Sequence, residues 1–260
     1  MKIGFFDSGL GGLIILKAVA AKLPQYDYEF YGDTAHVPYG DRTEEDIFQL
    51  TKVGVEHLFA RDCALVIIAC NTASAETTRR LQDTVLVGDY MSRRILGVII
   101  PTVEAVVEEK KVEVALIATK RTVESKKYEI EFAKLALKTN LLGTATPGLV
   151  PLIESGKREE AIDSLADYIS KLPSTVDALI LGCTHYCLLK EELRGLVGGG
   201  VTVFSQDEII PDKLASYLSR HPEITDVLTT SGTRNIFLTD NTSKYDGIIS
   251  TLLGGLLLPE

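Results

Sequence analysis

The sequence has few positive charges, few cysteines and no long hydrophobic run. Its 260 residues include 27 Lys and Arg against 36 Asp and Glu, a net charge of −9. Nucleic-acid binding depends on clusters of Lys and Arg that are absent here, so we expect no nucleic-acid partner. No stretch reaches the roughly 18 apolar residues that a membrane span requires, so no membrane association is expected. With 45% hydrophobic residues, the chain is predicted to be a soluble globular protein.

Only four cysteines are present. The opening segment MKIGFFDSG has too short an apolar run for a signal peptide, so we expect a cytoplasmic protein with reduced thiols. Cys187 lies four residues after Cys183 with His185 between them, but C-x-H-x-C is not a zinc spacing and no second ligand pair lies nearby. We therefore expect no metal site. Cys63, which opens a predicted strand, is interpreted as a small buried side chain.

Two of the cysteines lie in matching contexts. Cys70 follows an apolar run in LVIIACNTAS, and Cys183 follows another in ALILGCTHYC. Short runs of aliphatic residues are typical of buried parallel strands, and small polar residues follow where such a strand gives way to a helix. Both thiols are therefore predicted at the carboxyl ends of strands, the edge at which open α/β sheets bind ligands.

The similarity extends beyond the cysteines. The segments KIGFFDSG and EVALIATKRT each end an apolar strand, the first before Cys70 and the second before Cys183, at nearly the same distance along the sequence. The Val-Pro pairs of GDTAHVP and GTATPGLVP are separated from each other by the same number of residues as the two cysteines. We interpret this as two copies of an α/β unit of about 100 residues. If the units face each other, Cys70 and Cys183 lie on opposite walls of one cleft.

Strand and helix patterns alternate along the chain, which indicates βαβ crossovers and parallel sheets. The predicted strands span 3–7, 28–32, 64–69, 95–100, 113–118, 139–144, 177–182 and 201–204, with a late strand in VLTTSG. The predicted helices span 12–22, 43–60, 73–83, 102–110, 122–137, 158–171, 187–197 and 207–220, followed by a terminal helix. We predict a first α/β domain from 1–97 plus 208–260 and a second from 98–207.

The glycines of DSGLGG invite a dinucleotide-binding interpretation, with Asp33 as the ribose-binding acid. The third glycine of G-x-G-x-x-G would fall on Ile14, and no G-K-[ST] follows to form a P-loop. We favour a tight strand-to-helix turn that brings backbone N–H groups close to a small anion.

Two facing thiols have a specific chemical use. An isolated thiol has a pKa of about 8.5, so it can serve as a base when ionised and as an acid when protonated. One thiolate can remove a proton from a substrate carbon while the other thiol delivers a proton to the opposite face. The product is the mirror image of the substrate.

Three ionisable residues are candidates to assist. Asp7 could relay the proton of Cys70, and Glu154 and His185 could do the same for Cys183. Each has a simpler interpretation: Asp7 as a helix cap, His185 as a structural histidine and Glu154 as a solvated helix residue.

Five segments resemble motifs of the glutamate racemases of the aspartate/glutamate racemase superfamily and occur in the same order, from residue 3 to about 190. They are DSGLGG, GDTAHVPYG, ACNTASA, VPLIESG and LGCTHYCLL. The resemblance implies two pseudo-symmetric α/β domains with an active site in the interdomain cleft. It also implies racemisation of glutamate without pyridoxal phosphate or metal, supplying D-glutamate for peptidoglycan, and a homodimer.

The resemblance also implies roles for individual residues. The first catalytic cysteine of the family usually accepts the proton of the D-enantiomer and the second that of the L-enantiomer. The implied catalytic residues are Cys70, Cys183, Asp7, Glu154 and His185. The implied substrate contacts are Asp7, Ser8, Tyr39, Gly40, Asn71, Thr72, Thr119, Thr122, Thr184 and His185.

Three places depart from the family pattern. Cys187 replaces a proline, and the segment GVIIPTVEA differs from the more common GVIEP form. Arg121 replaces a small residue and could reach the cleft rim or the substrate carboxylate. Three alternative functions remain. An aspartate racemase would share the motifs. A hydrolase or transferase would use Cys183 and His185 through a covalent intermediate, and a non-catalytic module would only bind an amino acid. The last two need no second thiol, so the duplicated cysteine disfavours them.

Overall fold

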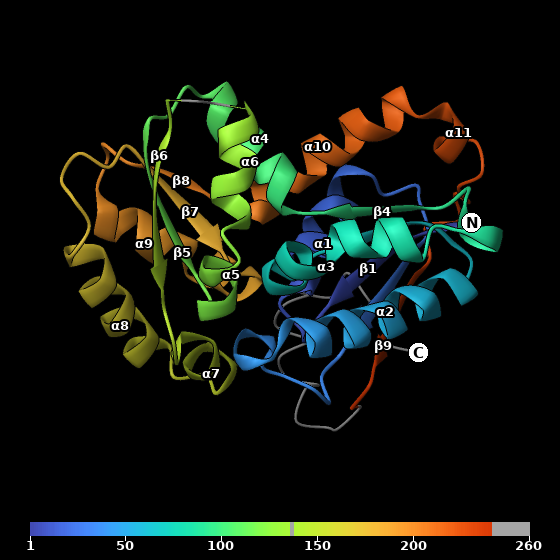
Figure 1. The fold of residues 1–260 in the computed structure, drawn as a ribbon, viewed down its shortest axis with the longest axis horizontal. Helices are drawn as coiled ribbons and strands as arrows, with labels where there is room; N and C mark the ends of the chain where they lie inside the picture. The colour runs from blue at the N-terminus through green and yellow to red at the C-terminus, as the bar shows by residue number, and fades with distance from the viewer. Residues whose placement is uncertain (136–137, 241–260) are drawn as a thin grey trace.

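The computed structural model describes residues 1–135 and 138–240, which form two parallel β-sheets with helices on their faces (Figure 1). The first sheet has the strand order β4-β3-β1-β2-β9, and the second has the order β6-β5-β7-β8. The strands are β1 (Lys2–Asp7), β2 (Tyr28–Gly32), β3 (Cys63–Ile68), β4 (Arg94–Gly97), β5 (Glu113–Ala118), β6 (Asn140–Ala145), β7 (Ala178–Gly182), β8 (Thr202–Phe204) and β9 (Arg234–Leu238). The predicted α/β fold with parallel sheets is confirmed.

Helices connect the strands. The α-helices are α1 (Gly12–Lys22), α2 (Glu44–Ala60), α3 (Asn71–Thr84), α4 (Ile99–Glu108), α5 (Lys120–Glu124), α6 (Lys127–Leu135), α7 (Leu149–Glu154), α8 (Arg158–Ser170), α9 (Lys190–Val197), α10 (Gln206–Arg220) and α11 (Pro222–Thr225). The short 3₁₀ helices are η1 (Tyr39–Asp41), η2 (Gly88–Tyr90) and η3 (Thr184–Leu189). Within the described part of the chain, no helix is both long and apolar enough to cross a bilayer.

The two sheets repeat one arrangement. β1, β2, β3 and β4 occupy the same relative places in the first sheet as β5, β6, β7 and β8 do in the second, and β9 extends the first sheet beyond β2. The neighbouring pairs are parallel throughout. This order supports the internal duplication inferred from the sequence. It places Cys70, after β3, and Cys183, after β7, at equivalent strand ends.

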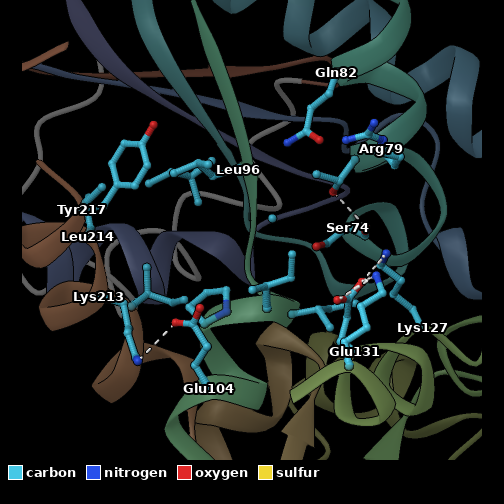
Figure 2. A pocket seen from close by; sticks show the side chains of 18 of the residues that line it. Ser74, Arg79, Gln82, Leu96, Glu104, Lys127, Glu131, Lys213, Leu214 and Tyr217 are labelled. Atoms are coloured by element: carbon cyan, nitrogen blue, oxygen red, sulfur yellow. Dashed lines mark hydrogen bonds and ion pairs between the residues drawn. The ribbon is translucent and has the colours of Figure 1, made fainter. Parts of the chain in front are cut away.

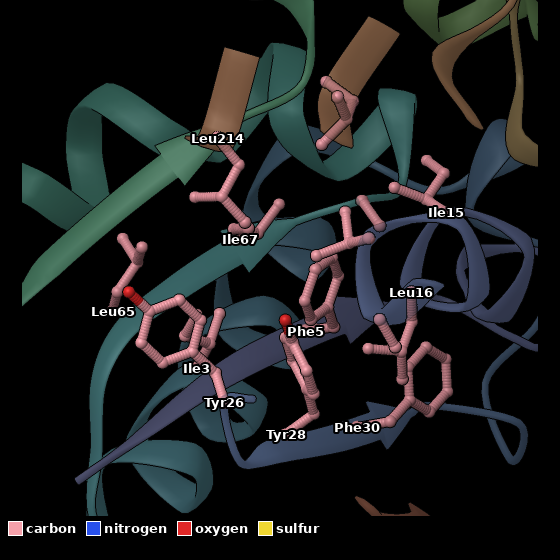
Figure 3. Close-up of a cluster of buried hydrophobic side chains, with 14 of the residues drawn as sticks. Ile3, Phe5, Ile15, Leu16, Tyr26, Tyr28, Phe30, Leu65, Ile67 and Leu214 are labelled. Atoms are coloured by element: carbon pink, nitrogen blue, oxygen red, sulfur yellow. The ribbon is translucent and has the colours of Figure 1, made fainter. Parts of the chain in front are cut away.

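Apolar residues on both faces of the first sheet fix its strand ends. Ile3, Phe5 and Phe30 pack beneath Leu16 of α1 and Leu214 of α10 in one buried cluster (Figure 3). The opposite face packs under α2 and α3. Burial of each large side chain contributes about 1.5–3 kcal/mol, so the strands and the helices that follow them are held rigidly.

Helix α10 joins the two halves. It follows β8, a strand of the second sheet, but its Ile210, Leu214 and Leu218 are buried in the core of the first sheet. The chain thus returns to the first half close to the predicted position 208. The domain boundaries 1–97 plus 208–260 and 98–207 stay a prediction.

Several predicted elements were wrong in extent. The strand expected at 95–100 ends at Gly97, because α4 begins at Ile99. Pro101 falls in the first turn of α4, where backbone N–H groups have no helical partner, so it is compatible with a helix start. The helix expected at 122–137 is divided into α5 and α6, since Lys126 has φ +52°. The helix expected from 187 is preceded by η3, which begins at Thr184.

The late strand was misplaced. VLTTSG does not form it; β9 lies at Arg234–Leu238 and pairs with β2. The N–H of Thr229 instead donates to the carbonyl of Met1, at 2.7 Å, and Gly232 turns the chain with φ +71°. The predicted terminal helix lies outside the described residues.

Candidate active site

A cavity of about 100 Å³ lies where the carboxyl ends of the two sheets meet, and both predicted catalytic cysteines line it. Most of the other predicted site residues line it as well: Ser8, Tyr39, Gly40, Asn71, Thr72, Thr119, Glu154, Thr184 and His185. Two predicted residues, Asp7 and Thr122, are not among the lining residues. Predicted site residues from both halves of the chain thus line one cavity.

Cys70 forms the wall on the side of the first sheet. It is the N-cap of α3, and its Sγ accepts a hydrogen bond from the N–H of Ala73 at 3.5 Å. The hydroxyl of Ser8 donates to the same sulfur at 3.2 Å. Burial, with the nearby Asp7 carboxylate, raises the pKa of Cys70 to about 12. The thiol form of Cys70 is therefore favoured near neutral pH.

Asp7 lies behind this wall. It ends β1, is fully buried, and accepts a hydrogen bond from the N–H of Gly9 at 3.0 Å. Burial raises its pKa, against the opposing effects of His185 and of backbone N–H groups. The N-cap of α1 is Gly11, so Asp7 is not a conventional helix cap. A carboxyl with a raised pKa beside Cys70 is suited to exchange a proton with it.

The opposite wall contains Cys183, His185 and Glu154 in a line. Nδ1 of His185 lies 3.7 Å from Sγ of Cys183, and Nε2 lies 3.0 Å from Oε1 of Glu154. Burial alone would lower the pKa of His185, but its interactions with Cys183 and Glu154 outweigh burial and raise the pKa well above its usual value. A positive imidazolium in this position stabilises negative charge on the Cys183 sulfur.

Gly11 permits the close packing of this wall against α1. A Cβ atom at position 11 would lie 2.2 Å from Oγ1 of Thr184 and 3.0 Å from Nδ1 of His185. Only a residue without a side chain fits, so the glycine-rich turn serves the contact between the two halves of the protein. The expected tight strand-to-helix turn is present.

Three hydroxyl groups connect the two halves beside the cavity. Oγ1 of Thr72 lies 2.9 Å from Oγ1 of Thr119 and 3.2 Å from Oγ1 of Thr122. The last two hydroxyls are 2.9 Å apart. Thr72 lies in the first turn of α3, Thr119 is the N-cap of α5 and Thr122 lies in its first turn, so a substrate at this place would meet hydroxyls from both sides.

Tyr39 and Gly40 form a third side. The Tyr39 hydroxyl donates to Oδ2 of Asp33 at 2.6 Å, so its hydrogen is used within the protein. Asp33 also accepts from Thr239 at 2.9 Å and therefore organises this loop. Gly40 lies against Thr119, with an added Cβ only 3.1 Å from that side chain.

Arg121, which departs from the family pattern, does not line the cavity. Its Nε lies 2.7 Å from Oε1 of Glu76 and its Nη2 lies 3.8 Å from Oε2 of Glu44. It thus pairs α5 of one half with α2 and α3 of the other. Of the two possibilities raised for Arg121, the cleft rim and the substrate carboxylate, this arrangement does not support contact with the carboxylate.

Sequence reasoning missed several lining residues. They are Val37, Pro38, Asp41, Lys120, Thr146, Pro147, Gly148, Val150 and Pro151. The two Val-Pro pairs were noticed as landmarks of the repeat, and their matching positions were a signal that both lie at the site. Lys120 gave no such signal.

The remaining cysteines are apart from the cavity. All four cysteines are free thiols. Cys63 is fully buried in β3, and burial raises its pKa to about 12; burial does the same for Cys187. Neither lines the cavity, so both are interpreted as packing residues.

A larger pocket of about 500 Å³ lies elsewhere, between α3, α4, α6 and α10 (Figure 2). Several of its charged residues are engaged in ion pairs: Lys213 lies 3.2 Å from Glu104, and Lys127 lies 2.6 Å from Glu131. It contains none of the predicted catalytic residues. The smaller cavity is therefore the candidate active site, because the facing thiols are there.

Comparisons with known proteins agree with this geometry. The sequence profile of the Asp/Glu/Hydantoin racemases matches residues 14–208. A glutamate racemase from Ruegeria pomeroyi is 42% identical over 238 residues, covering 86% of this chain and 87% of its own.

Solved structures are also similar. Glutamate racemase isoform RacE1 from Bacillus anthracis superposes with a TM-score of 0.88 at 28% identity, over 100% of this chain and 96% of that one. A Francisella tularensis glutamate racemase in complex with D-glutamate has a TM-score of 0.86 at 26% identity, over 99% and 95%. Profile, sequence and structure thus agree, and the chain belongs to the Asp/Glu/Hydantoin racemase family.

Proposed function

We propose that this protein is a glutamate racemase that interconverts L- and D-glutamate with two cysteines and without pyridoxal phosphate or a metal. The observation that carries the proposal is that Cys70 and Cys183 line one cavity from the strand ends of different sheets. The relatives named above are glutamate racemases, which favours glutamate over aspartate as the substrate.

From L-glutamate, the Cys183 thiolate takes the proton from Cα, and the electron pair of the broken C–H bond passes into the α-carboxylate. The Cys70 thiol then donates its proton to the opposite face of Cα, which gives D-glutamate. In the reverse direction the two sulfurs exchange roles. The raised pKa of Cys70 favours its thiol form, which is the form that donates a proton when the reaction starts from L-glutamate.

Catalysis needs stabilisation of the carbanion, since the proton on Cα is weakly acidic. Hydrogen bonds to the α-carboxylate lower the barrier as negative charge builds up there. The side chains of Thr72 and Thr184 and the first N–H groups of α3 supply donors around the cavity. Lys120, also at the cavity, attracts a dicarboxylate electrostatically.

The wider biological assignments belong to the same proposal. We propose the two domains given by the sequence, the site in the cleft between them, a homodimer, a cytoplasmic location and a role in supplying D-glutamate for peptidoglycan. Asp7, Glu154 and His185 are proposed as the residues that assist proton movement at the two thiols.

The test is racemisation in deuterium oxide with no added cofactor. We expect loss of optical rotation with deuterium incorporated at Cα, and no racemisation by Cys70→Ser or Cys183→Ser, both of which should still bind glutamate. Cys70→Ser retains the Cys183 thiolate, so it should exchange the Cα proton of L-glutamate without inverting it. Cys183→Ser should do so only with D-glutamate.

Two outcomes would contradict the mechanism. Near-normal turnover by either variant would exclude a need for both thiols. A covalent adduct on Cys183, seen as a mass shift with an ester or amide substrate, would favour Cys–His hydrolase chemistry instead.

A further inference from the structure

A buried polar network lies behind Asn71, the residue that follows Cys70. The amides of Asn71 and Gln206 form a reciprocal pair, in which each Nδ2 or Nε2 donates to the oxygen of the other at 2.8 Å. The hydroxyl of Tyr128 donates to the same Asn71 oxygen, also at 2.8 Å. All three residues are almost fully buried. None of these contacts is explained by the hydrophobic packing of α3, α6 or α10.

The contacts of Gln206 favour one direction for the hydrogen bonds of this network. The Thr102 hydroxyl donates to the carbonyl of Val98 at 2.7 Å, so it can only accept from Nε2 of Gln206, at 3.4 Å. Nε2 of Gln206 therefore faces Thr102, the Asn71 oxygen and, at 3.3 Å, the Tyr128 hydroxyl, while its own oxygen faces the Asn71 nitrogen. Turning over one of the two amides alone would place like groups together and leave buried polar atoms unpaired.

This arrangement decides what Asn71 offers to the cavity that it lines. Both lone pairs of its Oδ1 are used, one by Gln206 and one by Tyr128. One hydrogen of its Nδ2 goes to Gln206, which leaves a single N–H donor. Asn71 is thus prevented from accepting a hydrogen bond from an ammonium group and is prepared to donate one to an anion.

We propose that Gln206 and Tyr128 are positioning residues of the racemase, which hold the Asn71 amide with its free N–H directed at a substrate carboxylate. Because Asn71 is the residue next to Cys70, the same contacts fix the first turn of α3 on which that thiol lies. The inference rests on the proposed function and assigns catalytic importance to two residues outside the cavity.

A double-mutant cycle on kcat/KM separates this role from a purely structural one. Tyr128→Phe removes one donor to Asn71, and we expect a loss of about 3- to 10-fold, the effect of one buried hydrogen bond. Gln206→Met removes the reciprocal pair, and a loss of about 10- to 30-fold is expected. In an Asn71→Ala background, each change should cost less than about 2-fold, since the residue through which they act is gone.

Tyr28→Phe is the matched control. Its hydroxyl is buried and donates to the carbonyl of Leu23 at 2.7 Å, in the core of the first sheet. It should lower the melting temperature as Tyr128→Phe does, with kcat/KM unchanged. If Asn71→Ala abolishes measurable turnover, the same cycle is carried out on the dissociation constant of D-glutamate by calorimetry.

The possible results are distinct. Equal losses in the native and Asn71→Ala backgrounds, or full activity of Asn71→Ala, would overturn the positioning role while leaving the racemase assignment intact. A native protein that does not racemise glutamate would instead overturn the proposed function. Losses that disappear in the Asn71→Ala background support the inference.

Discussion

Replacing Gly11 with alanine tests whether the site depends on close contact between the two halves. The added Cβ would lie 2.2 Å from Oγ1 of Thr184, where ordinary contacts begin near 3.4 Å. Rotation of the threonine side chain would not relieve the clash, because Cβ of Thr184 is 2.9 Å away and Nδ1 of His185 is 3.0 Å away. The segment after Cys183 must therefore move by about 1 Å.

The cost follows from that displacement. A shift of about 1 Å in a catalytic group reduces activity by about 100-fold. Overpacking lowers the free energy of unfolding by about 1–3 kcal/mol, which a folded protein of this size can tolerate. We therefore expect Gly11→Ala to fold with a lowered melting temperature and to lose about two orders of magnitude in kcat/KM for racemisation.

Circular dichroism melts and polarimetric assays on the same preparation measure both quantities. Gly195→Ala is the control, because an added Cβ there meets no atom within 4 Å, and activity should stay unchanged. If Gly11→Ala racemises glutamate at the native rate, the inferred contact between α1 and the Cys183 wall does not govern the site.

Two further predictions concern charged groups. Glu154→Gln removes a charge that raises the pKa of His185, so His185 should lose its proton at a lower pH than in the native protein. We expect kcat/KM to fall about 10-fold and the alkaline limb of its pH profile to move to lower pH. An alkaline limb that does not move would contradict a charged His185. Burial would raise the pKa of Asp27, but hydrogen bonds from Thr229 and Thr233 lower it to about 2. Asp27→Asn should therefore cost about 2 kcal/mol in urea unfolding near pH 7, and the deficit should shrink as pH falls from about 4 towards 2. A deficit independent of pH would refute this account.

The strand-end positions of the site could be predicted from sequence because apolar runs and the polar residues after them are local signals. LVIIAC and ALILGC each end a buried strand, and the repeated spacing of strand ends and Val-Pro pairs was enough to pair Cys70 with Cys183. The parallel sheets followed from the alternation of strands and helices.

Other features depend on contacts between distant segments. Nothing near Asn71 in the sequence indicates Gln206, which lies on the helix that returns from one half to the other. The break at Lys126 depends on a single left-handed residue, and α4 begins at Ile99 within an apolar stretch that resembles a continuing strand. The late strand was misplaced because Thr229 bonds to Met1 at the far end of the chain.

The two sheets repeat one strand order, yet the surroundings of their terminal thiols differ: one has a serine hydroxyl and a buried carboxyl, the other an imidazole backed by glutamate. Mirror-image amino acids have equal free energies in water, so the racemase must show the same kcat/KM for both. This equality does not apply to kcat, so the unlike environments of the two thiols allow kcat to differ between the enantiomers. A duplicated scaffold with unmatched chemistry at its two ends is thus expected to process one enantiomer faster than the other when both are abundant.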